Sequence, residues 1–148
     1  MKIVKLDKNV VNEVVSVLKS GGLVIYPTET LYGIAADPTN PDAIKKLTTY
    51  KNRPLGKPYS IAVTDIDMAS KYVELNTTAV NLYKRFLPGP LTVISKGKHK
   101  LAPGVESEDG SLGVRVPDYQ LVSEIINKFG KPITATSANA SYKKRPYS

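Results

Sequence analysis

Four short segments concentrate hydroxyl groups and cationic side chains at predicted loops and strand ends. They are residues 27–33 (PTETLYG), 51–57 (KNRPLGK), 111–117 (SLGVRVP) and 134–139 (TATSAN). In the third segment Ser111, Gly113 and Arg115 alternate, so they share one face of a predicted strand. A charge on a covered sheet face is costly unless it has a partner. Taken singly, each segment also fits a proline-bounded turn, a salt bridge or a strand-end cap; together they favour binding of phosphate and carboxylate groups.

Several common chemistries are disfavoured by the residue types. The chain has no Gly-x-x-x-x-Gly-Lys-Ser/Thr phosphate loop and no Gly-x-Gly-x-x-Gly turn after a strand. It has no cysteine, and its single histidine, His99, lies in a Lys-rich stretch with nothing nearby in sequence to fix its tautomer. We therefore expect neither a Ser-His-Asp hydrolase nor a protein-bound metal centre. Catalysis would depend on positioning and charge neutralisation, as in phosphoryl and nucleotidyl transfer.

Length and composition are typical of one globular domain spanning residues 1–148, with 41% apolar and 23% charged residues. No apolar run approaches the roughly 20 residues that span a bilayer, so we expect a cytoplasmic protein without a membrane partner. The formal charge is +8, from 21 basic and 13 acidic side chains. Part of this excess of positive charge lies at Lys96, Lys98 and Lys100 and at residues 143–145. These clusters fit either a nucleic-acid contact or a solvated surface.

Alternating strands and helices are predicted to position the four segments. Apolar runs predict strands over residues 3–6, 23–26, 60–63, 91–95, 112–116 and 133–136. Caps and helical spacing predict helices that begin at Asn9, at Asn40, at Asp65 or Asp67, at Asn76 or Thr77, and at Asp118. This alternation, without internal repeats, predicts a layered α/β or α+β domain around one sheet.

The ordered motifs resemble those of the YrdC-like family, whose members include threonylcarbamoyl-AMP synthases. The similar stretches are PTETLYGIAADP, KNRP, FLPGPLTV, GVRVPD and PITATSANAS, within residues 27–141. The pairing of Lys51-x-Arg53 with Ser137-x-Asn139 is the hallmark of that family. The resemblance implies a twisted mixed sheet flanked by helices, with a concave basic face that binds ATP and L-threonine side by side. Compared with the domains of that family, this domain is expected to be shortened at its C-terminus.

The resemblance also implies roles for individual residues. Lys51 and Arg53 match the catalytic Lys-x-Arg pair that faces the nucleotide phosphates. The positions expected to bind ATP are Arg53, Lys57, Ser111, Ser137 and Asn139, and those expected to bind threonine are Thr30, Arg115 and Ala135. Some synthases carry a histidine in the strand after the Lys-x-Arg loop, whereas residues 61–63 (IAV) offer none.

The activity that the resemblance implies is ATP-dependent synthesis of L-threonylcarbamoyladenylate. L-Threonine and bicarbonate or CO2 would form a carbamate that attacks the α-phosphorus of ATP, with Mg²⁺ as cofactor and pyrophosphate as leaving group. A downstream transferase would use the product to make threonylcarbamoyladenosine in tRNA. The alternative is a non-catalytic module that binds tRNA or double-stranded RNA. Carbamoyl-adenylate chemistry on another acceptor, as in hydrogenase-maturation relatives, is a third and weaker possibility.

Overall fold

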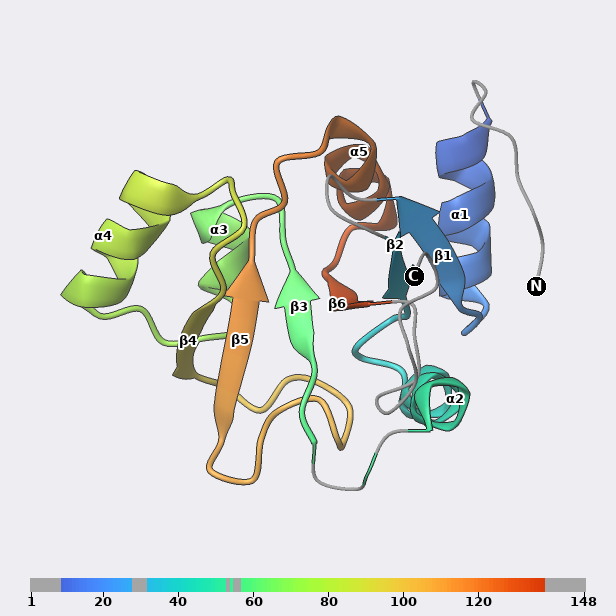
Figure 1. The fold of residues 1–148 in the computed structure, drawn as a ribbon, viewed down its shortest axis with the longest axis horizontal. Coiled ribbons are helices and arrows are strands. Elements are labelled where there is room, and N and C mark those ends of the chain that lie inside the picture. The colour runs from blue at the N-terminus through green and yellow to red at the C-terminus, as the bar shows by residue number, and fades with distance from the viewer. Residues whose placement is uncertain (1–8, 28–31, 53, 55–56, 138–148) are drawn as a thin grey trace.

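The structure of the chain is a computed structural model that describes residues 9–27, 32–52, 54 and 57–137. Helices and strands alternate along these residues (Figure 1). The helices are α1 (Val10–Lys19), α2 (Pro41–Lys51), α3 (Ile66–Ala69), α4 (Thr77–Phe86) and α5 (Gln120–Phe129). The strands are β1 (Val24–Pro27), β2 (Tyr32–Ala35), β3 (Ser60–Ala62), β4 (Val93–Lys96), β5 (Ser111–Arg115) and β6 (Ile133–Ser137). Each predicted element within the described residues is confirmed, whereas the strand predicted over residues 3–6 lies outside them.

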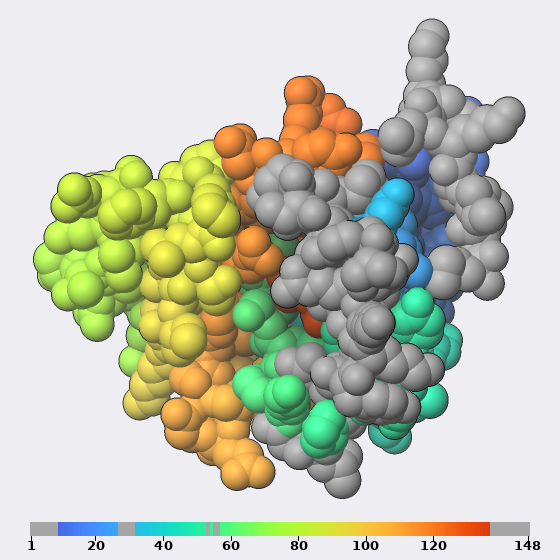
Figure 2. Space-filling model, viewed as in Figure 1, coloured from blue at the N-terminus to red at the C-terminus, as the bar shows by residue number. Residues whose placement is uncertain are grey.

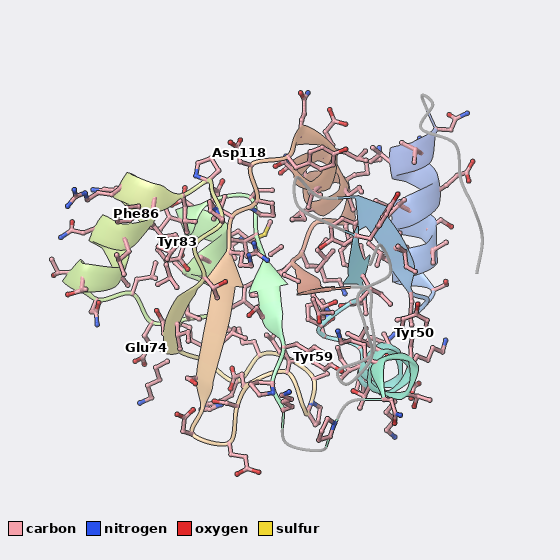
Figure 3. The ribbon with its side chains drawn as sticks, viewed as in Figure 1. Tyr50, Tyr59, Glu74, Tyr83, Phe86 and Asp118 are labelled. Carbon is pink, nitrogen blue, oxygen red and sulfur yellow. The ribbon has the colours of Figure 1, made fainter. Side chains whose placement is uncertain are left out.

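Polar residues at the predicted caps explain where most helices begin. The side-chain oxygens of Asn40 and Asn76 accept backbone N–H groups of the first turn, with N···O distances of 2.9 and 2.8 Å. Such bonds satisfy donors that a helix N-terminus leaves free. Helices α1 and α5 differ, because their N-caps, Asn9 and Tyr119, make no side-chain capping bond. The predicted cap at Asp118 is therefore wrong; Asp118 lies one residue earlier, exposed at the surface (Figure 3).

The six strands form one mixed sheet with the order β1-β2-β6-β3-β5-β4. Strands β3 and β5 are parallel, and the other neighbours are antiparallel. The central trio β6-β3-β5 therefore joins residues far apart in the chain. This topology confirms the predicted mixed α/β architecture and sets the last segment, in β6, two strands from the third, in β5.

Strand β2 is the one described strand that the sequence pattern did not predict. It follows β1 as an antiparallel partner, with Gly33 opposite Tyr26. The Tyr26 ring lies over Gly33 so closely that a Cβ atom there would stand 2.6 Å from the ring carbon Cζ. Because Gly33 has no side chain, the Tyr26 ring can pack directly against its backbone in the hairpin.

One face of the sheet is covered by α2, α3, α4 and the long connection before β5. Side chains such as Ile34, Ile61 and Val114 alternate onto this face and are fully buried. The opposite face is covered over β1, β2 and β6 by α1 and α5, which contact each other. Two apolar layers therefore sandwich the β1-β2-β6 half of the sheet.

The second face is not covered by any described helix over β5, β4 and the start of β3, and this side faces the viewer in Figure 1. Ala62, at the end of β3, is buried in the same cluster as α1 and α5. Residues of β4 and β5 accordingly lie at the surface in Figure 2. We call this region the open face. Its described side chains are Ser60 of β3, Ser111 and Arg115 of β5, and Ile94 and Lys96 of β4, with Gly113 among them.

Tyr83 of α4 lies between that helix and the sheet (Figure 3) and is only 3% exposed. Its hydroxyl has no hydrogen-bond partner in the part of the chain that the structure describes, and burial raises its pKa to about 12. We expect Tyr83→Phe to increase the free energy of unfolding by about 1 kcal/mol, because it removes a desolvated, unpaired hydroxyl. Denaturant unfolding measures this change.

Tyr59 provides the matched control, since its hydroxyl lies 2.9 Å from the Thr48 hydroxyl. Tyr59→Phe should lower the free energy of unfolding by about 1 kcal/mol. Equal destabilisation by the two substitutions would contradict the assignment of an unpaired Tyr83 hydroxyl.

Candidate functional site

The structure describes six of the nine sequence-predicted site residues. Ser111 and Arg115 lie on β5, Ala135 and Ser137 on β6, Lys51 ends α2, and Lys57 precedes β3. For Ser137 only the backbone is described, which pairs with Gly33. Thr30, Arg53 and Asn139 lie outside the described residues, so their roles remain predictions.

The central strands align small residues in one row across the sheet. Ala135 of β6 pairs with Ser60 of β3, and Gly113 of β5 pairs with Ile94 of β4. The register of β3 and β5 sets Ser60 beside Gly113. Because paired residues share a face, Ser60, Gly113 and Ile94 lie side by side on the open face, and Ala135 continues the row onto β6.

Ser111 and Arg115 flank this row at the two ends of β5. They are four residues apart on one strand face, a separation of about 13 Å. Arg115 is half-buried, and no side chain among the described residues pairs with its guanidinium. An unpaired, partly desolvated guanidinium is a strong site for a ligand carboxylate or phosphate. The two predicted contacts for nucleotide and amino acid are thus brought onto one surface.

Ser111 is held by two residues that the sequence analysis missed. The Ser107 hydroxyl lies 2.6 Å from the Ser111 hydroxyl and donates a hydrogen bond to Asp109. The backbone N–H of Ser111 donates to the same Asp109 carboxylate at 2.9 Å. The alternation of Ser, Asp and Ser over residues 107–111 was the available signal, because such residues favour turns closed by side-chain bonds.

Because of these hydrogen bonds, the pKa of the Asp109 carboxyl indicates whether the turn over residues 107–111 is formed. The hydrogen bond from Ser107, followed by those from Ser111, lowers the Asp109 pKa to about 2 from its ordinary value of 3.8. The bonds therefore favour the folded turn above pH 3.8, and their contribution is lost as the pH falls through about 2.

We expect Ser107→Ala to raise the Asp109 pKa toward its ordinary value, because the largest stabilising bond to the carboxylate is removed. NMR titration of the carboxyl carbon measures this shift. Ser123→Ala, on α5, is the control and should leave the Asp109 pKa unchanged. An unaltered pKa in the Ser107 variant would contradict the network.

Lys51 is 2% exposed at the last turn of α2, although lysine is rarely this buried. The left-handed backbone of Asn52 (φ 53°) ends the helix directly after it. Tyr59 ties the following segment to α2 through its bond to Thr48, and its N–H donates to the Val105 carbonyl at 3.0 Å. Helix α2 and the start of β3 are therefore held together around the Lys51–Lys57 loop, while Lys57 itself is exposed.

His99 is not the isolated histidine that the sequence suggests. Its Nδ1 atom lies 2.8 Å from the Glu106 carboxylate, and its backbone N–H donates to the same group at 3.0 Å. The expectation that nothing orients this ring is wrong. The pair closes the connection between β4 and β5, and the His99 side chain is 70% exposed there. The position of His99 is consistent with a structural role in holding this loop closed, and not with a catalytic base.

A resident metal does not fit the described donor set. No group of three or more His, Asp or Glu side chains that could hold a metal ion occurs among the described residues. The candidate residues that the structure describes have cationic or hydroxyl side chains, apart from one alanine. Magnesium usually binds through substrate phosphates and water, and the Mg²⁺ that the resemblance implies stays a prediction.

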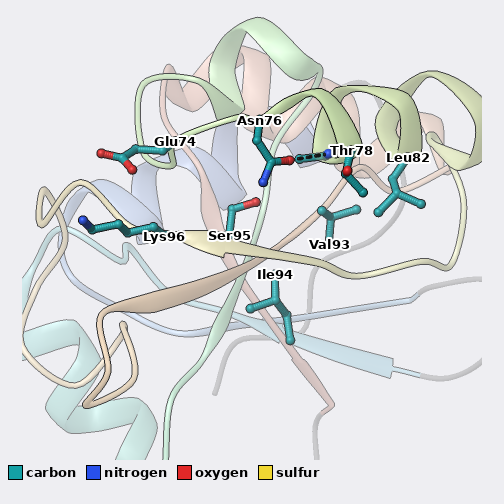
Figure 4. A pocket seen from close by; sticks show the side chains of 9 residues that line it. Glu74, Asn76, Thr78, Leu82, Val93, Ile94, Ser95 and Lys96 are labelled. Carbon is teal, nitrogen blue, oxygen red and sulfur yellow. Dashed lines mark hydrogen bonds between the residues drawn. The ribbon is translucent and has the colours of Figure 1, made fainter.

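Two pockets adjoin strand β4. The larger, of about 230 Å³, lies between the start of α4 and the outer edge of β4 (Figure 4). Its rim carries Glu74 and Lys96, and Val93 and Leu82 lie within it. The smaller, of about 110 Å³, lies on the open face and includes Ser111 and Gly113. The smaller pocket therefore shares a predicted site residue.

The basic cluster in the β4–β5 connection is a surface feature. Lys96, Lys98 and Lys100 are exposed, and the Lys98 ammonium donates to the Ser70 carbonyl at 2.6 Å. The second cluster, residues 143–145, lies outside the described residues. Within the described ranges, no helix has both the length and the apolar content needed to span a bilayer.

Comparison with known proteins relates this geometry to a family. Residues 16–148 match the Sua5/YciO/YrdC family, which is described as "Telomere recombination". The chain is 37% identical over 131 residues to the threonylcarbamoyl-AMP synthase of Photobacterium profundum, covering 86% of this chain and 70% of that protein. It is 39% identical over 133 residues to the threonylcarbamoyl-AMP synthase of Aliivibrio fischeri, covering 88% and 72%.

The fold is similar to that of P. abyssi Sua5, whose crystal structure was determined in complex with L-threonine. The TM-score is 0.89 at 28% sequence identity, and the match covers 97% of this chain. The chain spans 42% of the length of that protein. Sequence motifs, sheet topology and relatives agree, and the chain belongs to the Sua5/YciO/YrdC family.

Proposed function

We propose that the chain synthesises L-threonylcarbamoyladenylate from L-threonine, bicarbonate or CO2, and ATP, with release of pyrophosphate. The observation that carries this proposal is the open face, where Arg115 and Ser111 project from β5, two strands from Ala135 of β6. The close fold similarity to a protein solved with L-threonine, and the identity to two named synthases, support the same assignment.

The reaction suits a site without a side-chain nucleophile. The threonine amine attacks the carbon of CO2, or of bicarbonate with loss of hydroxide, and then loses a proton to give a carbamate. A carbamate oxygen attacks the α-phosphorus of ATP, a new P–O bond forms, and the bond to the pyrophosphate oxygen breaks. The second step brings two anions together, the carbamate and the ATP phosphates, and in this proposal the cations of the site neutralise their charge.

Each described residue is given the role that the family resemblance implies. Arg115 binds the threonine carboxylate through its two-pronged guanidinium, and the Ala135 backbone contacts the same ligand. Ser111, held by Ser107, contacts the nucleotide. Lys51 and Lys57 neutralise charge on the phosphates. Arg53, Ser137 and Asn139 complete the nucleotide site and Thr30 the threonine site in this proposal.

In this proposal ATP enters as its magnesium complex, since Mg²⁺ usually binds through substrate phosphates and water. The product is a mixed anhydride, which is an activated acyl donor. A downstream threonylcarbamoyl transferase then moves the acyl group to tRNA adenosine, giving threonylcarbamoyladenosine. The relatives do not favour the alternative of a non-catalytic RNA-binding module, since they are named as synthases.

The test is threonine-dependent pyrophosphate release. The purified chain, with ATP, Mg²⁺, bicarbonate and L-threonine, should release pyrophosphate and form a product with the mass of threonylcarbamoyl-AMP. Omission of threonine or bicarbonate should abolish both signals. Absence of threonine-dependent pyrophosphate over a wide range of enzyme concentration would overturn the proposal.

A further inference from the structure

The connection between β4 and β5 contains a strained residue. His99 has a left-handed backbone (φ 58°), which only one other residue apart from glycine adopts among the described residues. Such a backbone is unfavourable for a residue with a side chain and persists only where surrounding contacts hold it. At His99 these contacts come from Glu106, whose carboxylate accepts the His99 backbone N–H at 3.0 Å and lies 2.8 Å from ring atom Nδ1. The strain therefore raises the question of what this loop geometry serves.

Glu106 is the fixed member of this pair. Its side chain is 13% exposed, against 70% for His99. The carboxylate lies directly over Gly97, where any Cβ atom would collide with it. The preceding residue, Val105, is fully buried, and its carbonyl accepts the N–H of Tyr59, next to β3, at 3.0 Å. The carboxylate is therefore anchored to the core, and it holds His99 in place.

The same pair adjoins both ends of the turn that holds Ser111. Glu106 is directly followed by Ser107, whose N–H donates to the Ser111 carbonyl at 2.9 Å and whose hydroxyl lies 2.6 Å from the Ser111 hydroxyl. At the other end, a Cβ atom on Gly110 would lie 3.5 Å from the His99 ring carbon Cε1, so the ring packs beside Gly110. Gly110 directly precedes Ser111. Movement of the pair would therefore loosen the turn from both sides.

We propose that His99 and Glu106 are positioning residues that fix the Ser111 hydroxyl for contact with the ligand. The proposal rests on the proposed function for the identity of that ligand, ATP. A serine side chain has three staggered rotamers, and the bond to Ser107 selects one of them while the turn stays closed. The pair keeps the turn closed without touching substrate. A group that is already ordered in the free protein costs less conformational entropy when the ligand binds.

His99→Gly tests the proposal, because glycine accepts the left-handed backbone and removes the ring. We expect the dissociation constant for ATP, measured by titration calorimetry, to rise about fivefold, the usual effect of losing one hydrogen bond. The dissociation constant for L-threonine should not change, because Arg115 lies about 13 Å from Ser111 along β5. Lys100→Gly is the matched control, since it places a glycine at the next, exposed position and leaves the bonds to Glu106 intact. Thermal unfolding checks that both variants fold.

Two further measurements separate positioning from a purely structural role. In Ser111→Ala protein, His99→Gly should cause no further loss of ATP affinity, because the group that it positions is absent. Amide exchange of the Ser111 N–H, which donates to Asp109, should become about fivefold faster in His99→Gly as the turn opens more often. The Gly130 N–H, bonded to the Ile126 carbonyl at 2.8 Å, should exchange at the wild-type rate.

The outcomes distinguish this proposal from the proposed function. If wild-type protein binds ATP and His99→Gly acts through Ser111 as expected, positioning is supported even where threonine-dependent pyrophosphate release is absent. If pyrophosphate release is normal but His99→Gly leaves ATP affinity unchanged, or weakens it equally in the Ser111→Ala protein, His99 is not a positioning residue. Wild-type protein that binds no ATP would overturn both proposals.

Discussion

Replacement of Arg115 by alanine should raise the KM for L-threonine at least about 30-fold. Truncating one member of a hydrogen-bonded charge pair costs about 2–5 kcal/mol, which corresponds to a factor of about 30 to 5,000. Arg115 has no partner side chain among the described residues, so in the free protein its loss leaves no described group unpaired. We therefore expect a binding defect without a loss of stability, measured by steady-state kinetics and thermal unfolding.

Two further variants sharpen this result. Arg115→Lys keeps the charge but loses the planar fork, and should raise the threonine KM about tenfold. Arg85→Ala is the matched control, because Arg85 lies on α4 with its guanidinium 5.6 Å from the Phe86 ring centre. A threonine KM that is equally unaffected in all three variants would remove Arg115 from the site.

Replacement of Lys51 by methionine should lower kcat for pyrophosphate release about 100- to 1,000-fold, the usual effect of losing one fixed charge or donor at a reacting centre. Methionine retains the apolar stem in this buried position, where lysine is 2% exposed. Pre-steady-state measurement of adenylate formation separates the chemical step from substrate binding. The KM for threonine should change little, because the carboxylate contact belongs to Arg115.

Lys45→Met on the same helix is the control for Lys51. Lys45 is exposed, so the substitution changes the net charge by the same amount without touching the buried end of α2. If both variants lose activity equally, the effect is one of overall charge. If Lys51→Met retains full kcat, Lys51 does not stabilise the reacting phosphates.

The coverage of the sheet explains the position of the candidate site. Helices α1 and α5 bury one face of the sheet over β1, β2, β6 and the end of β3, and no described helix covers that face over the start of β3, β5 and β4. The open face retains a rigid floor, because its reverse side packs on the larger apolar core. Binding groups on a sheet backed by a core are held with little freedom, which favours catalysis by positioning.

Local sequence determined most of the helices and strands. Asn40, Asn76 and the left-handed Gly130 mark ends that depend on bonds within one turn, so they could be predicted from a few neighbouring residues. The motifs around Lys51, Arg115 and Ser137 also sufficed to identify the family and the chemistry. Both kinds of information reside in contiguous stretches of the chain.

Tertiary structure alone decided the remaining features, because each depends on contacts between distant segments. Strand β2 exists as a partner for β1, and its Gly33 is explained only by the Tyr26 ring across the hairpin. The pairing of His99 with Glu106 closes a loop whose shape no local pattern specifies. Register between β3, β5 and β4 brings Ser60, Gly113 and Ile94 together and leaves Ile94 exposed. Residue types thus predicted phosphate and carboxylate binding, and the packing of the sheet determined which part of it no described helix covers.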